Sequence, residues 1–169
     1  MPSYIKDTGD LKRLNRQLGK VADGKALRKE LSGGFRKALK PVVPKLRAAY
    51  LANPGHTGQR SRTRAGQPNL RTLLAKSVRL EIRGSGRFAG ARIRADGRKM
   101  PDGMKALPKY YEGEIARWRA PVYGNRSAWA QYRARPTFFR TVEPEEPAVS
   151  KAIGAVLDRV RDKLEKGDP

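Results

Sequence analysis

Cysteine is absent from the 169 residues, and so is any long hydrophobic run. Without thiols the chain offers neither a disulfide framework nor a thiolate metal site. A membrane span needs about twenty consecutive apolar residues, and the opening MPSYIKDTGD lacks the apolar region of a signal peptide. We therefore expect a protein that is made in, and first acts in, a cytoplasm and that has no membrane partner.

Groups that perform catalysis are equally scarce. The single histidine, His56, lies in a Gly/Pro-rich segment with no pair of acidic residues nearby. General acid–base catalysis usually needs at least two positioned titratable groups, and a zinc site needs three or four ligands. Glu112 and Glu114 would lie on different faces of a helix or on one face of a strand, and we expect both to be solvated. The sequence predicts no enzymatic activity, no metal and no cofactor.

Large hydrophobic residues are few. Leu, Ile, Val and Phe together number 33 of 169, just under the one-fifth below which a highly charged chain is suspected of disorder. The length suits one domain, which we assign to residues 1–169, with its core at about 24–166, an N-terminal helical extension at 1–23 and a long basic loop at 53–69. We expect a monomer that needs neighbours to complete its ordering.

Acidic side chains are outnumbered by basic ones, 16 to 38, which gives a formal net charge of +22. The excess lies early in the chain: residues 1–53 carry 13 basic and 4 acidic groups and residues 54–100 carry 12 and 2, whereas residues 144–169 carry 5 and 6. Such a field attracts polyanions, and it repels further copies of the chain unless salt or a partner neutralises it.

Helical spacing of apolar residues predicts two N-terminal helices. The first covers residues 10–21, with Asp10 as its N-cap. The second covers about 24–52, and Pro41 and Pro44 predict a kink near residue 41, because proline removes a backbone donor and crowds the preceding turn. The apolar positions are Leu11, Leu14, Leu18 and Val21 in the first helix, and Leu27, Leu31, Phe35, Leu39, Val42, Val43, Leu46 and Tyr50 in the second.

A long loop and a β-hairpin follow. Residues 53–69 are rich in Gly, Pro, Ser and Thr, which is typical of a loop, and a short apolar turn comes next at 70–74. Apolar and polar residues then alternate over 78–83 and again over 91–95, which predicts a hairpin with one apolar and one basic face. We interpret GSGRFAG between the strands as the hairpin turn and not as a phosphate-binding loop, because it opens no helix.

Arginines gather on this loop and hairpin, and no RNA-recognition, zinc-finger or basic-zipper pattern accompanies them. We expect them to make sequence-independent contact with phosphates or to line a surface that faces DNA; a merely solvated face is the alternative. The members of this basic patch are Arg60, Arg62, Arg64, Arg79, Arg83, Arg87, Arg92 and Arg94.

Residues 117–140, RWRAPVYGNRSAWAQYRARPTFFR, hold six arginines, six of the twelve aromatic residues and no acid. We expect a strand that ends in a turn at 122–125, a returning strand, and a short helix after Pro136 that contains Phe138 and Phe139. Arg, Trp and Tyr are enriched both at protein interfaces and on nucleic-acid-binding surfaces. Core burial is the alternative for any one aromatic residue, but the interleaved arginines make it difficult to bury all six.

An amphipathic helix is predicted at the end of the chain. Pro144 lies in its first turn, with Glu145 and Glu146 favourably placed at the positive end of the helix dipole. Its apolar stripe consists of Val149, Ile153, Val156, Leu157, Val160 and Leu164. The order of helix, hairpin, further strands and helix predicts an α+β fold, a small antiparallel sheet packed with a kinked N-terminal helix and a C-terminal amphipathic helix.

This order of features resembles the neck or tail-completion proteins, the head-tail joining proteins of long-tailed bacteriophages, particularly those from actinobacterial hosts. The similarity covers roughly residues 24–166. It includes the kinked basic helix, Thr57-Gly58, a Ser-Val-x-Leu strand at 77–80, Ala-Arg-Ile at 91–93, RWRAPVYGNRSAW at 117–129 and the final helix. In that family the middle of the motif often reads Arg-His-Pro-Val-Phe-Gly. Arg119-Ala120-Pro121-Val122-Tyr123-Gly124 retains this pattern except that alanine replaces the histidine and tyrosine replaces the phenylalanine.

The resemblance implies a structural protein of the virion, assembled in the host bacterial cytoplasm. It implies a homo-oligomeric ring, expected to be a hexamer, at the head-tail junction, between the head connector or head-closure protein and the tail terminator or tail tube, with genomic DNA passing through its lumen. A closed ring needs a heterologous interface. We expect this interface to draw on Trp118, Arg119, Pro121, Tyr123, Trp129 and Tyr132, with the acidic Glu145 and Glu146 meeting a basic surface next door.

The alternative is a sequence-nonspecific nucleic-acid-binding protein that acts free in solution. Salt dependence distinguishes the two functions. For a protein held by phosphate contacts, the logarithm of the affinity falls steeply and linearly with the logarithm of the salt concentration. Ring contacts built on Trp and Tyr are expected to persist at high salt.

Overall fold

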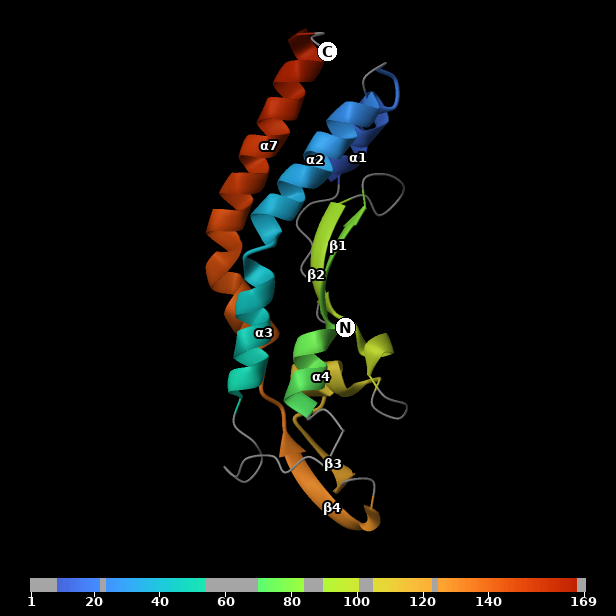
Figure 1. Cartoon of the computed structure of the whole chain (residues 1–169), viewed down its shortest axis with the longest axis vertical. Helices are drawn as coiled ribbons and strands as arrows, with labels where there is room; N and C mark the ends of the chain where they lie inside the picture. The colour runs from blue at the N-terminus through green and yellow to red at the C-terminus, as the bar shows by residue number, and fades with distance from the viewer. Residues whose placement is uncertain are drawn as a thin grey trace. The chain divides into compact units, whose positions relative to one another are not determined.

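The computed structural model describes residues 9–21, 24–53, 70–83, 90–100, 105–122 and 125–166 (Figure 1). These residues fall into two compact units. Unit 1 comprises the described parts of 44–79 and 94–143, and unit 2 comprises those of 3–43, 80–93 and 144–169. Helices and antiparallel strands are both present, so the predicted α+β class is confirmed.

Unit 2 is built on three helices, and its helices α2 and α7 lie side by side (Figure 1). The three are α1 (Gly9–Leu18), α2 (Gly24–Leu39) and α7 (Glu146–Lys166). Their apolar stripes face one another, and the buried cluster consists of Leu14, Leu18, Leu27, Leu31, Phe35 and Val160, with Ile153, Val156, Leu157 and Leu164 packed against it. The spacing of three and four residues along each helix produces this core. The segment predicted as an N-terminal extension thus contributes Leu14 and Leu18 to the core of unit 2.

One glycine sets how closely α2 and α7 approach. A Cβ atom added at Gly34 would lie 2.5 Å and 2.6 Å from the two methyl carbons of Val156, closer than real side chains pack. A Cβ added at the neighbouring Gly33 would meet nothing within 4 Å. Gly34 is therefore required by packing, whereas Gly33 is not.

The predicted kink in the second helix is confirmed. Helix α2 ends at Leu39, Lys40 and Pro41 form a turn, and α3 (Val42–Ala52) begins directly afterwards. Pro44 lies in the first turn of α3, where its missing N–H costs no intrahelical hydrogen bond. Of the eight apolar positions predicted for this helical region, seven are buried and Val43 is half-buried.

Unit 1 contains most of α3, three short helices and a second strand pair. The short helices are α4 (Leu70–Ser77), α5 (Leu107–Tyr111) and α6 (Phe138–Val142), and the strands are β3 (Arg117–Val122) and β4 (Asn125–Arg133). A 3-10 turn, η1 (Gly97–Lys99), and a second one, η2 (Glu143–Glu145), complete the order of elements. Buried hydrophobic side chains of this unit include Leu46, Tyr50, Leu74, Val78, Ala95, Tyr111 and Phe138.

The two strands predicted at 78–83 and 91–95 are confirmed as β1 (Val78–Arg83) and β2 (Gly90–Ala95), which pair with each other. Most of the turn predicted between them, residues 84–89, lies outside the described residues. Ile93 and Ala95 are buried, as their alternation with arginine predicts. Residues 78–79 and 94–95 belong to unit 1, and 80–83 and 90–93 to unit 2.

Some local predictions are wrong. Asp10 is the second residue of α1 and not its N-cap, since the helix begins at Gly9. Val21 follows the end of α1 and is 43% exposed. The expected apolar turn at 70–74 is instead part of helix α4, because Leu70, Leu73 and Leu74 also fit helical spacing. The last helix begins at Glu146, with Pro144 in the preceding turn η2.

Candidate interaction surface

The aromatic and arginine-rich segment folds as the antiparallel pair β3–β4. Its register places Arg117 opposite Arg133, Trp118 opposite Tyr132 and Arg119 opposite Gln131. The register continues to the pair Pro121–Trp129, after which it shifts. Because successive side chains on a strand point to opposite faces, this register sorts the segment into two chemically different faces.

The inner face of the hairpin carries Trp118 and Tyr132. Their rings are stacked, with centroids 5.6 Å apart and planes inclined by 15°. Trp118 also contacts the rings of Tyr110 and Tyr111 at 6.1 Å and 6.2 Å, and Tyr111 meets the buried Tyr50 edge-on. Offset and edge-on ring pairs each stabilise by about 0.5–1.5 kcal/mol beyond their buried area. This face therefore fastens the hairpin to α5 and α3 within unit 1.

The outer face, which we call the interaction face, consists of Arg117, Arg119, Trp129, Gln131 and Arg133. All five side chains are exposed, and half of the Trp129 surface reaches solvent. The Arg119 guanidinium lies over the Trp129 ring, 5.1 Å from its centroid, in a cation–π arrangement. No acidic residue occurs anywhere from 117 to 133. The face is thus cationic and partly aromatic, and its own strands carry no acidic residue that could neutralise its charge.

Glu112 binds segments that flank the base of this hairpin, and the expectation that it would be solvated is wrong. Its carboxylate accepts a hydrogen bond from the Tyr50 hydroxyl at 2.8 Å and from the backbone N–H groups of Thr137 at 3.0 Å and Phe138 at 2.9 Å. Burial raises the pKa of Glu112, partly offset by these hydrogen bonds. Sequence spacing could not reveal this role, because the partners lie 62, 25 and 26 residues away. Glu114 is exposed beside Lys109, as expected.

Further hydrogen bonds near Glu112 join the segment after β4 to α5 and to the end of α3. The Arg135 N–H donates to the Tyr111 carbonyl at 2.8 Å, immediately after β4. The Asn53 side-chain amide donates to Thr137 Oγ1 at 2.8 Å, and Arg71 donates to the Asn53 carbonyl at 2.9 Å. The interaction face is therefore carried by a hairpin whose base is tied to α3, α4 and α5.

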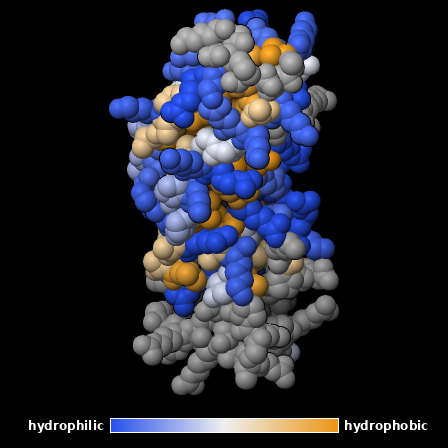
Figure 2. Space-filling view, turned by 45° about the horizontal axis from the view of Figure 1, so that its top comes forward, coloured by the Kyte–Doolittle hydropathy of each residue, from blue (hydrophilic) through white to orange (hydrophobic). Residues whose placement is uncertain are grey.

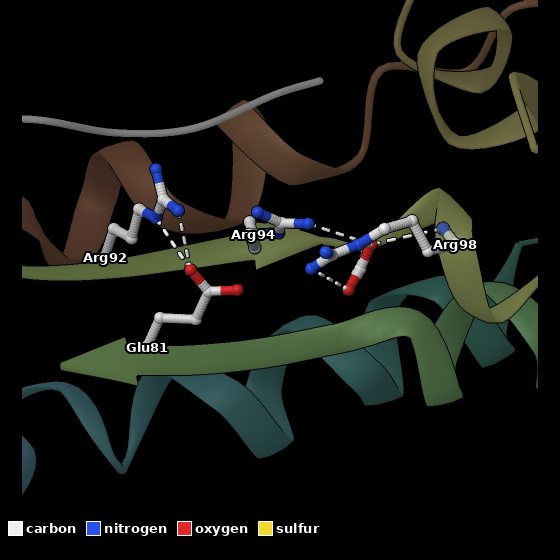
Figure 3. A network of polar contacts seen from close by, with 5 residues as sticks. Glu81, Arg92, Arg94 and Arg98 are labelled. Atoms are coloured by element: carbon white, nitrogen blue, oxygen red, sulfur yellow. Dashed lines mark hydrogen bonds and ion pairs between the residues drawn. The ribbon is translucent and has the colours of Figure 1, made fainter. Parts of the chain in front are cut away.

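The basic patch predicted on the first hairpin is partly neutralised within the chain (Figure 3). In unit 2, Arg92 donates twice to one carboxylate oxygen of Glu81, at 2.9 Å and 2.7 Å. In unit 1, Asp96 accepts from Arg94 at 2.9 Å and from the Arg98 guanidinium at 3.1 Å. The hydrogen bonds from Arg98, supported by Arg94, hold the pKa of the buried Asp96 carboxyl well below its usual range. Arg92 and Arg94 therefore serve the fold as well as carrying charge.

Other members of the predicted sites are placed as follows. Arg79 is half-buried and Arg83 is exposed. Glu145 and Glu146 are both half-buried, at the junction of η2 and α7. Arg60, Arg62, Arg64, Arg87, Tyr123, His56 and the side chain of Pro121 lie outside the described residues. The structure thus brings together Arg119 and Trp129 from the predicted interface, but separates them from Trp118 and Tyr132 by turning the latter to the inner face.

Arg117, Gln131 and Arg133 are the surface residues that the site prediction missed. A signal was available, because all of them stand an even number of residues from Arg119 or Trp129. Period-two spacing places such residues on one face of a strand. What the sequence lacked was the register between the two strands.

Hydrophilic residues dominate the coloured surface on the side shown in Figure 2, with smaller hydrophobic areas between them. Among the described residues, no group of three or more histidine, cysteine or acidic side chains could hold a metal ion. No helix in the described part of the chain is long and apolar enough to cross a membrane. Comparisons with known proteins find no family model, no curated protein and no solved structure that matches this chain.

Proposed function

We propose that the protein is a structural component of a bacteriophage virion, which forms a ring at the head-tail junction, joins the head connector to the tail and lines the passage of the DNA. The observation that carries the proposal is the interaction face. The segment in which the sequence resembles neck proteins, RWRAPVYGNRSAW, forms a hairpin that presents arginines and an exposed tryptophan to solvent. A surface of this kind suits contact with a polyanion, because its charge is uncompensated by its own strands.

Assembly is supported by the modest hydrophobic content of each unit. Among the described residues of unit 2, the buried cluster holds six side chains from three helices, and the chain as a whole is poor in large aliphatic side chains. Burying further surface against neighbouring copies would add stability that a lone subunit lacks. The subunit contacts of the ring are expected to survive salt if they are built on aromatic and aliphatic groups.

The test is the mass of the purified, nuclease-treated protein across a range of salt concentrations, with a trace of duplex DNA added in parallel. Nuclease treatment is needed because carried-over DNA could imitate assembly. We expect one discrete oligomer that persists at high salt, or a monomer that closes into one when a connector or tail protein is added. A protein that stays monomeric with every such partner would contradict the ring.

A second candidate function is sequence-nonspecific nucleic-acid binding by the free protein. The net charge of +22 and the acid-free interaction face favour it. A persistent monomer that binds DNA tightly, with log affinity falling linearly and steeply against log salt, would establish this function in place of the ring.

A further inference from the structure

We propose that the interaction face binds single-stranded nucleic acid, with the Trp129 ring stacked on a base and Arg117, Arg119 and Arg133 contacting phosphates. The inference rests on the contact with nucleic acid that both proposed functions contain. It goes beyond them by naming the site, the strandedness of the ligand and the residue that recognises an unpaired base.

The β3–β4 hairpin carries an electrostatic cost of its own. Arg117 and Arg133 lie directly opposite each other across the two strands, and like charges in that position destabilise a strand pair. Arg119 adds a third positive charge on the same face, and neither strand offers a carboxylate to offset the repulsion. A phosphate backbone laid across the face would relieve it.

The spacing of these charges suits a chain of phosphates. Residues two apart on a strand are separated by about 7 Å, so Arg117 and Arg119 present two guanidinium groups in a row along β3. Arg133 presents a third from β4. Each guanidinium carries several N–H donors with which to bind phosphate oxygens. Gln131, opposite Arg119, adds an uncharged donor and acceptor between the cations.

Trp129 favours a single strand over a duplex. Its side chain is 50% exposed, although it belongs to a residue type that is normally well buried. An exposed aromatic ring beside arginines is the arrangement with which proteins bind unpaired bases, since every base has a face on which to stack. In a duplex those faces are already stacked on one another. Arg119, held over the indole at 5.1 Å, is positioned to bind the phosphate next to the stacked base.

The experiment measures the affinity of the whole chain for an oligothymidylate of about twenty nucleotides and for the matching duplex, by fluorescence anisotropy over a salt series. We expect Trp129→Ala to weaken binding of the single strand by roughly fivefold to a hundredfold, with its salt slope unchanged, and Trp129→Tyr to restore most of the affinity. Arg133→Ala is expected to reduce the salt slope by about 0.7, the share of one phosphate contact. The matched control is Arg159→Ala, which replaces an exposed arginine of α7. It should change the affinity and the salt slope far less.

Tryptophan emission provides a second readout that does not depend on affinity. Trp118 and Trp129 are the two tryptophans of the chain, and Trp118 is stacked on Tyr132. Oligothymidylate should quench the emission of the wild-type protein, and Trp129→Tyr should abolish most of that quenching. Unfolding curves of each variant verify that the fold is retained.

The outcomes separate this inference from the proposed functions. Tight binding of nucleic acid that is insensitive to Trp129→Ala, or equal affinity for duplex and single strand without quenching, would overturn the stacking site and leave the general contact with nucleic acid intact. No binding to either probe at low salt would overturn both. A discrete ring that binds neither probe would leave the virion role standing without its DNA-facing surface.

Discussion

The hydroxyl of Tyr50 and the carboxylate of Glu112 form a hydrogen bond of 2.8 Å that links α3 to the segment after α5. The second carboxylate oxygen accepts from two backbone N–H groups at the start of α6. Burial raises the pKa of Tyr50, reinforced by the charge of Glu112. One acidic side chain thus joins three elements of unit 1 around the base of the β3–β4 hairpin.

Glu112→Gln should change how stability depends on pH. Because burial raises the pKa of Glu112 above its ordinary 4.5, the folded state favours the protonated form. Its contribution to stability is therefore fully present below pH 4.5 and is lost as the pH rises through the folded value. As the pH rises from 4.5 through the folded pKa of Glu112, we expect the urea midpoint of the wild type to fall relative to that of Glu112→Gln.

The matched control for this change is Glu114→Gln, which alters an exposed glutamate two residues away. It should keep the wild-type pH profile. Parallel profiles for the wild type and Glu112→Gln would contradict the raised pKa, whatever their absolute stabilities.

Gly34→Ala and Gly33→Ala should have opposite effects on stability. Both replacements gain helix propensity, worth about 0.5–1 kcal/mol. At Gly34 the new methyl group collides with the stiff, β-branched Val156, and overpacking of this kind costs about 1–3 kcal/mol. Urea unfolding of the two variants measures the difference. If both stabilised the protein equally, the close approach of α2 and α7 at Gly34 would be refuted.

Asp96→Asn should destabilise the protein strongly at neutral pH. Asp96 is only 1% exposed and neutralises Arg94, and removing one partner of a buried ion pair costs about 3 kcal/mol or more. Because hydrogen bonds from Arg98 and Arg94 lower the pKa of Asp96, its contribution is fully present above the ordinary 3.8 and is lost as the pH falls through the folded value. Free energies of unfolding at neutral and acidic pH test both statements.

Glu81→Gln is the comparison for Asp96→Asn, because the Arg92–Glu81 pair is partly open to solvent. Such pairs contribute about 1 kcal/mol or less. A larger loss of stability at Glu81 than at Asp96 would reverse the expected order and count against the buried network.

Trp118 and Trp129 should differ sharply in their effect on folding. Trp118→Ala removes the ring that contacts Tyr110, Tyr111 and Tyr132, and we expect a cost of about 2–4 kcal/mol, near the values for large aromatic truncations. Trp129→Ala truncates an exposed side chain and should change stability by about 0.5 kcal/mol. Thermal unfolding followed by circular dichroism measures both. Similar losses of stability for the two variants would contradict the assignment of Trp118 to a packed face and of Trp129 to an exposed face.

Periodicity allowed much of the fold to be predicted. The helical stripes from Leu27 to Tyr50 and from Ile153 to Leu164, the break at Pro41 and the hairpin at 78–95 all follow from spacing and proline chemistry, which act within a few residues. The same reasoning was wrong for Glu112. A carboxylate two residues from another gives no local sign that distant N–H groups and a tyrosine hydroxyl will surround it.

By itself, the sequence determined the composition of the candidate surface and the class of the fold. It placed six arginines and six aromatic residues in one acid-free segment, and it set the apolar periods that make helices and strands. The virion ring and the contact with nucleic acid stay predictions that the experiments above address.

Only the tertiary structure decided which aromatic residue is available to a partner. Strand register turns Trp118 and Tyr132 towards Tyr110 and Tyr111, and it leaves Trp129 exposed beside Arg119. The pairing of β1 with β2 likewise decided that Arg92 meets Glu81, eleven residues away. The physical reason is that burial and ion pairing depend on which residues meet across strands and helices, and those contacts join positions that no local pattern connects.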